Sequence, residues 1–218
     1  MTTEERKVPT LIIDGLEGLG VSPMKAPDAS IFKIKTEAIA HKGSIQQLAP
    51  EDDPILKKVC EPFDFVSPKY GHPISIAQSL IMSMRAYGGV GLAAAQIGMP
   101  VRVFAIGYEK QNQVFFNPVI KEYSESKNKG KEGCISFPFC YAVVERSDWI
   151  RIAWQNEKGE PQEEVFSGYT ARIIQHEYDH MDGICLPDKV SKLMWKALKE
   201  KSRGLYKKAL KMQKRGQL

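Results

Sequence analysis

The nine residues 175–183 read Gln-His-Glu-Tyr-Asp-His-Met-Asp-Gly. Residues four apart lie one above the other on an α-helix, so His176 and His180 can present both imidazoles to one metal ion. Glu177 then lies beside that ion and can take a proton from a water bound to it. The plainer interpretation is an exposed helical turn that carries these residues by chance. The chain has only four histidines, so two at this spacing favour the metal site.

The composition fits one ordinary domain with additions. The chain has 218 residues, of which 43% are hydrophobic, and this is enough for a sizeable core. Four cysteines are too few for a disulfide scaffold, the first residues carry two acids instead of an apolar leader, and no apolar run is as long as a membrane span. We therefore expect a cytoplasmic protein that does not associate with a membrane and whose thiols stay free to bind metal.

Charge is divided unevenly along the chain. Residues 189–218 hold nine lysines and two arginines against a single acid, Glu200, which gives +10. The whole chain carries +5, so the difference leaves −5 for residues 1–188. A mildly acidic body with a strongly basic C-terminal segment favours a polyanionic partner.

The apolar pattern predicts an α+β protein. Residues 74–87 have apolar side chains at helical spacing, and a glycine-rich loop follows them. Strand patterns then come in succession without intervening helices, at residues 101–106, 114–116, 142–145, 149–154 and 163–166. Such strands form antiparallel sheets, which we expect to pack around a central metal-binding helix at residues 168–182. The C-terminal segment has the pattern of a basic amphipathic helix interrupted at Gly204.

A catalytic site of the zinc type needs a third protein ligand and one open position for water. In the metalloproteases with the pattern His-Glu-x-x-His-x-x-Gly-x-x-His, a third histidine would fall at position 186, where this chain has Leu186. A downstream glutamate is no better, because only Glu200 follows, inside the basic segment. A ligand from earlier in the chain is therefore favoured. A cysteine such as Cys134, taken alone, is most simply a small buried hydrophobe.

Three stretches resemble, in order and separation, the signature motifs of the peptide deformylases. They are residues 89–96 (Gly-Val-Gly-Leu-Ala-Ala-Ala-Gln), residues 132–136 (Glu-Gly-Cys-Ile-Ser) and residues 175–183. The joint occurrence of the three is far more specific than any one of them. The departures are Phe137 after the second motif, Met181 where leucine is usual, and Cys185-Leu186 where a Leu-Phe pair is common.

The resemblance divides the chain into three segments. It runs from about Asp52 to Lys189, so we expect a catalytic domain at residues 48–188 and a basic C-terminal helix at residues 189–218. Residues 1–47 form an N-terminal extension that has no counterpart in the typical family member, and no role can be assigned to it.

The resemblance implies a metal-dependent amide hydrolase. It would remove the N-formyl group from the initiator methionine of nascent polypeptides and release formate. The resemblance makes Glu177 the catalytic base, and one divalent metal ion would be held by Cys134, His176 and His180. Ferrous iron is what the family implies, and zinc, nickel or cobalt would also accept one thiolate and two imidazoles.

Other positions of the motifs would contact the substrate. The side-chain amide of Gln96 and the backbone N–H of Ile135 match the family's donors to the developing oxyanion. Ile173 lies three residues before His176 on the same helix face and, with Val90, would line an apolar pocket for methionine. The backbone groups that would bind the peptide as an added strand belong to Val90, Gly91 and Gly133.

Further expectations concern the surroundings of the site and the C-terminal helix. The family pattern suggests that Arg146 pairs with Asp179 and so orients the metal helix. As in bacterial members, the C-terminal helix would contact ribosomal RNA. The alternative, that its lysines only form a solvated helix face, is equally compatible with the sequence. The remaining cysteines are expected to be buried hydrophobes and the remaining histidines to be solvated, namely Cys60, Cys140, Cys185, His41 and His72.

Two alternative functions stay open. A zinc endopeptidase of the His-Glu-x-x-His type would cleave internal peptide bonds and ignore the formyl group. A nucleic-acid-binding or ribosome-binding module would hold a structural metal, and a structural site fills all four positions with protein ligands, such as His72 for the fourth.

Overall fold

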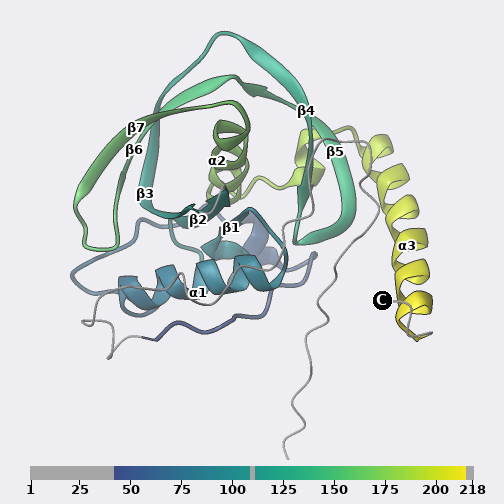
Figure 1. The fold of residues 1–218 in the computed structure, drawn as a ribbon, viewed down its shortest axis with the longest axis horizontal. Coiled ribbons are helices and arrows are strands. Elements are labelled where there is room, and N and C mark those ends of the chain that lie inside the picture. The colour runs from purple at the N-terminus through teal and green to yellow at the C-terminus, as the bar shows by residue number, and fades with distance from the viewer. Residues whose placement is uncertain (1–41, 109–110, 215–218) are drawn as a thin grey trace, which may run out of the picture.

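The strands of the protein form two antiparallel sheets. The structure is a computed structural model that describes residues 42–108 and 111–214 (Figure 1). The larger sheet has the strand order β1-β2-β3-β6-β7, with the bounds Gly91–Ala93, Val103–Tyr108, Gln111–Tyr123, Trp149–Gln155 and Pro161–Ser167. The smaller sheet consists of β4 (Lys127–Cys134) and β5 (Phe137–Ser147). Every pairing in both sheets is antiparallel, as predicted.

One helix lies between the sheets and two lie outside them. The described residues form α1 (Pro73–Ala86), α2 (Gly168–Met181) and α3 (Lys192–Lys214), with 3-10 turns at Pro54–Lys57, Ala94–Ile97 and Leu186–Lys189. In Figure 1, strands of both sheets surround α2, whereas α3 lies along the outer side of β5. The predicted α+β fold with antiparallel sheets around a central helix is therefore confirmed.

The larger sheet is covered on both faces. Along β2, Phe104 points into one apolar cluster while its neighbours Val103 and Ala105 point into another. The first cluster joins the sheet to α2 through Phe104, Phe115, Ile150, Trp154, Ala171, Ile174 and Met181. The second joins it to α1 through Ile76, Leu80, Met84, Val103 and Phe116. Burial on both faces explains why residues 101–106 read as a nearly continuous apolar run.

Strand β4 and the course of α3 differ from the sequence expectation. The strand β4 has the sequence Lys-Asn-Lys-Gly-Lys-Glu-Gly-Cys and mostly exposed side chains, so it has no alternating apolar pattern and was not predicted. It forms because its backbone pairs with β5 from Lys127 to Cys134. The predicted interruption of the C-terminal helix at Gly204 is wrong, since α3 runs through it. A single helical glycine costs only about 1 kcal/mol, and packing of α3 on β5 outweighs that cost.

The smaller expectations about cysteines and histidines have mixed outcomes. Cys60, Cys140 and Cys185 are buried, as predicted. His72 is exposed but has a local structural role, because its Nδ1 accepts a hydrogen bond from the backbone N–H of Ile74 at the start of α1. His41 lies outside the described residues. In the ranges 42–108 and 111–214, we find no helix with the length and apolar character that a membrane span requires.

Most of the predicted N-terminal extension, residues 1–41, lies outside the described residues, but its last part packs along α1. The backbone N–H of Gly43 donates to Gln78 Oε1 (2.8 Å), and that of Gln46 donates to Ser83 Oγ (2.8 Å). A Cβ atom on Gly43 would lie 2.5 Å from the Cβ of Gln78. The segment therefore lies directly on the helix surface.

Asn117, on β3, connects the larger sheet to the segment before α1 that contains Phe63. Its side chain accepts from the Phe63 N–H (2.6 Å) and donates to the Phe63 carbonyl (2.9 Å) and to Gln155 Oε1 (2.9 Å). Its φ of 49° lies in the left-handed region, which asparagine tolerates better than most residues.

We predict that Asn117→Ala lowers the free energy of unfolding by about 2–3 kcal/mol, because two half-buried backbone groups lose their partners. Urea denaturation measures the change. Asn117→Asp keeps the acceptor but not the donor, so it should fall between the wild type and Asn117→Ala. A loss below about 0.5 kcal/mol for Asn117→Ala would show that the anchor is unimportant.

Candidate metal centre

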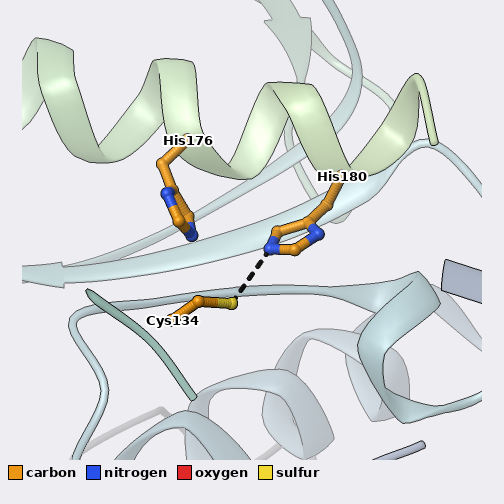
Figure 2. Close-up of side chains that lie close together, drawn as sticks. All are labelled: Cys134, His176 and His180. Atoms are coloured by element: carbon orange, nitrogen blue, oxygen red, sulfur yellow. Dashed lines mark hydrogen bonds between the residues drawn. The ribbon is translucent and has the colours of Figure 1, made fainter. Parts of the chain in front are cut away.

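Three potential metal ligands converge between α2 and the end of β4. The ligand atoms of Cys134, His176 and His180 all lie within 4.8 Å of one another, and Cys134 Sγ is 3.3 Å from His180 Nε2. Figure 2 shows both imidazoles pointing from α2 toward the cysteine sulfur. The helix therefore supplies two nitrogen atoms and the strand one sulfur atom to the same point. One thiolate and two imidazoles are a ligand set that zinc and ferrous iron accept.

Hydrogen bonds to Nδ1 of each ring leave Nε2 facing the point where a metal ion would bind, and Nε2 of His180 contacts Cys134 Sγ there. His176 Nδ1 is 3.0 Å from Glu132 Oε2, so the carboxylate holds the ring proton on Nδ1. His180 Nδ1 lies 3.8 Å from the sulfur of Cys185, whose thiol donates to the Leu56 carbonyl (3.3 Å). Burial lowers the pKa of His180 well below its ordinary value. That ring is therefore held in the neutral form that binds metal.

Glu132 is the residue of this region that the sequence analysis did not assign a role. Burial alone would raise its pKa, but hydrogen bonds from His176 and Arg146 lower it to about 2. The strand that carries Glu132 has no alternating pattern in the sequence, so the signal that could have identified this residue is its place in the second motif, two residues before Cys134. The predicted pair of Arg146 and Asp179 is present (2.6 Å), and the same guanidinium also binds Glu132 through two nitrogen atoms.

Glu177 is buried beside the three ligands and lacks a partner at one oxygen. Its Oε2 has no hydrogen bond to any residue that the structure describes, and burial raises its pKa to about 7. A buried acceptor without a partner fits a site that binds a further group, such as water on a metal ion. Gly91 makes room for this carboxyl group, because a Cβ atom there would lie 2.2 Å from Glu177 Oε1.

Gln96 points its donor group into the same site. Its Oε1 accepts from the backbone N–H of Ala93 (2.8 Å), which fixes the orientation of the amide. Its Nε2 donates to Ser136 Oγ (2.9 Å) and lies 3.5 Å from Cys134 Sγ. The chain turns at Ile135 directly after Cys134. Both predicted oxyanion donors are therefore near the predicted thiolate ligand Cys134. Gln96 contacts its sulfur atom, and Ile135 is the next residue in the chain.

The predicted substrate-binding residues lie on elements around the ligands. Ile173 is buried on α2, and Val90 packs against the same apolar cluster. Gly91 begins β1, which is an edge strand of the larger sheet, and an edge strand can accept a further strand. Gly133 lies under Tyr141, because a Cβ atom at this glycine would be 2.7 Å from the ring.

Comparison with known proteins identifies the family. Residues 45–195 match the family model described as polypeptide deformylase. The chain belongs to the peptide deformylase family. Members of this family are metal-dependent hydrolases, so the chain is an enzyme of that kind. The resemblance seen in the three sequence motifs is therefore confirmed.

Individual relatives agree with this assignment. The chain is 38% identical over 139 residues to the peptide deformylase of Thermotoga petrophila, covering 64% of this chain and 83% of that one. It is 41% identical over 136 residues to that of Pseudothermotoga lettingae, with 62% and 77% covered. The solved deformylase of Thermotoga maritima superimposes with a TM-score of 0.63 at 34% identity, over 68% of this chain and 99% of that one.

A solved complex is also similar. The deformylase of Acinetobacter baumannii bound to Met-Ala-Ser superimposes with a TM-score of 0.64 at 30% identity. The match covers 68% of this chain and 99% of that chain.

We predict that Gly91→Ala lowers kcat/KM for a formyl-Met peptide by about 100-fold or more, because the new methyl group displaces Glu177 by about 1 Å and misplacement on that scale has such an effect. Formate release measures it. Gly204→Ala on α3 is the matched control, since no atom lies within 4 Å of a Cβ there, and it should keep full activity. Near-normal activity in Gly91→Ala would contradict the placement of Glu177.

Proposed function

We propose that this deformylase removes the N-formyl group from the initiator methionine of nascent polypeptides, using a divalent ion held by Cys134, His176 and His180. The observation that supports it most directly is the convergence of these ligand atoms within 4.8 Å. Glu177, with its unpartnered oxygen, is buried beside them. Ferrous iron is the proposed ion, in line with the family resemblance.

The ligand set fits a catalytic metal better than a structural one. In the described part of the chain, no fourth histidine, cysteine or carboxylate joins the group of three, which would leave one position open for water or substrate. His72, the fourth ligand of the structural alternative, instead caps the start of α1. When bound, the ion supplies Lewis acidity, which lowers the pKa of water and polarises a carbonyl group.

Glu177 is proposed as the general base and then the general acid. Its carboxylate takes a proton from the attacking water as the new C–O bond forms at the formyl carbon. It then passes the proton to the amine nitrogen as the C–N bond breaks, so the products are formate and a free amino terminus. Burial raises the pKa of Glu177 to about 7, and a value near the working pH suits a group that performs both transfers.

Gln96 and Ile135 are proposed to stabilise the oxyanion that develops at the formyl oxygen. The Gln96 amide is held by Ala93 and Ser136 before substrate binds, so its donor needs little reorganisation during the reaction. The backbone N–H of Ile135 would be the second donor. Each preorganised donor of this kind typically lowers the barrier by about 3 kcal/mol.

The peptide is proposed to bind as an additional strand. Gly91, at the start of the edge strand β1, and the preceding residue Val90 would provide backbone groups on one side, and Gly133 would provide those on the other. The apolar cluster that contains Ile173 and contacts Val90 would receive the methionine side chain. The similar Acinetobacter baumannii structure, which has Met-Ala-Ser bound, supports this class of ligand.

We predict that Glu177→Ala lowers the rate of formate release from formyl-Met-Ala-Ser by several orders of magnitude, because the reaction loses both proton transfers. Metal content, measured on the same samples, should stay at one ion per chain. An isosteric Glu177→Gln variant should be equally inactive, which separates loss of the base from loss of packing.

The same assay separates the alternative functions. Cleavage of internal peptide bonds without formate release in the wild type would indicate an endopeptidase. Absence of both reactions in the metal-loaded wild type would favour the binding module.

The C-terminal helix is proposed to bring the enzyme to ribosomal RNA in the cytoplasm. One side of α3 packs on β5, where Trp195 meets Phe137 edge to face (centroids 5.4 Å apart) and Ser202 Oγ donates to the Pro138 carbonyl (2.9 Å). Basic side chains on the remaining surface are exposed, among them Lys192, Lys196, Lys201 and Arg203. These would be free to contact phosphate groups.

We predict that the triple variant Lys192→Glu, Lys196→Glu, Lys201→Glu weakens ribosome binding, reduces its salt dependence and leaves hydrolysis of formyl-Met-Ala-Ser unchanged. Sedimentation with ribosomes at several salt concentrations measures it. A matched variant makes the same charge change at exposed lysines of other elements, Lys121, Lys129 and Lys158. Equal ribosome affinity of the wild type and the α3 variant at low salt would contradict the proposal.

A further inference from the structure

Arg172 is a buried arginine that has no role in the proposed reaction. It lies four residues before His176 on α2, and its exposed fraction is only 7%. A buried guanidinium is costly unless each of its donors has a partner. Arg172 lies on the face of α2 that carries His176, so its contacts can affect the position of that histidine.

The Arg172 guanidinium joins three structural elements. Its Nη1 donates to Glu132 Oε1 (2.8 Å) and to the Val144 carbonyl (2.8 Å), and its Nη2 donates to the Asn128 carbonyl (2.9 Å) and side-chain oxygen. Asn128 and Glu132 belong to β4, and Val144 belongs to β5. One side chain of α2 therefore binds both strands of the smaller sheet.

Gly130 provides the space for this guanidinium. A Cβ atom at Gly130 would lie 2.7 Å from Arg172 Cζ and 2.8 Å from Nε. Any other residue at position 130 would push the guanidinium away from its acceptors. The strand that ends at Cys134 thus has a gap that fits the arginine.

The contacts also continue from Arg172 to a proposed metal ligand. Glu132 Oε1 accepts from Arg172, and Glu132 Oε2 accepts from His176 Nδ1 (3.0 Å). Arg146 binds the same carboxylate through two nitrogen atoms, each at 3.0 Å. Arg146 can therefore neutralise Glu132 without Arg172, but Arg146 does not carry the described contacts to Asn128 and Val144 that Arg172 makes.

We propose that Arg172 is a positioning residue of the metal centre. Its guanidinium, which fits against Gly130, holds the strand that carries Cys134 against the helix that carries His176 and His180. The inference rests on the proposed function, because it takes these three residues as the metal ligands. Lysine cannot replace this arginine, since a compact ammonium group cannot reach acceptors on two strands in the geometry of a planar fork.

The test measures metal binding by the full-length chain with Co²⁺ as the probe. We expect Arg172→Met and Arg172→Lys to raise the dissociation constant for Co²⁺ by about 10- to 100-fold, as changes behind metal ligands usually do. We also expect the visible absorption bands of the Co²⁺ protein to shift. Arg151→Met, which removes an exposed arginine paired with Glu122 on the larger sheet, should change neither quantity.

Gly130→Ala tests the fit from the other side without altering the arginine. It should raise the dissociation constant for Co²⁺ to a similar extent, and combining it with Arg172→Met should have no further effect, because both changes remove the same contacts. An unchanged dissociation constant in folded Arg172→Lys or Gly130→Ala protein would overturn the proposal, as would additive effects in the double variant. If Arg172→Met does not fold, the other two variants carry the test.

Different results are expected if the proposed function, and not the role of Arg172, is wrong. If the wild type does not bind one Co²⁺ ion, or if Cys134→Ser leaves the Co²⁺ spectrum unchanged, the metal ligands themselves are wrong. Weak binding confined to the Arg172 and Gly130 variants, with a normal wild type, is the result expected for a positioning residue.

Discussion

The charge on the buried Glu132 carboxylate is the constraint on which the rest of the site depends. Four donor atoms converge on it: two from Arg146, one from Arg172 and one from His176. These donors come from β5 and α2, whereas the carboxylate belongs to β4. Removing one partner of a buried ion pair typically costs about 3–5 kcal/mol, because the charge that remains is uncompensated. This cluster joins α2 to the smaller sheet, and so fixes the relative positions of the three candidate ligands.

The two glutamates near the ligands are in opposite environments. Glu132 is saturated with donors and its pKa is about 2, whereas Glu177 is buried with an unpartnered oxygen and its pKa is about 7. The charge on Glu132 itself helps to raise the pKa of Glu177, although burial is the larger cause. Two carboxyl groups whose pKa values differ in this way can have different roles, one as a permanent anion and the other as a group that exchanges protons. Glu132 is suited to orient His176, and Glu177 is suited to exchange protons with the substrate.

Much of the fold and part of the site could be predicted from local sequence patterns. The spacing of His176 and His180 indicates a shared helix face, and the apolar runs indicate the strands that are buried on both sides. Strand β4 escaped prediction because its exposed lysines leave no alternating pattern, and only pairing with β5 makes it a strand. The roles of Arg172 and Gly130 could not be predicted, since they lie 42 positions apart in the chain and meet only in the folded protein.

X-ray absorption by the zinc-loaded protein tests the central claim most directly, because it reports the atoms bound to the metal ion. Three protein ligands from Cys134, His176 and His180 predict one sulfur atom at about 2.3 Å and two nitrogen atoms at about 2.0–2.1 Å. A further light atom from solvent is expected at the open position. The sulfur signal should disappear in Cys134→Ser. A spectrum of the wild type without sulfur, or with four protein ligands, would contradict the account.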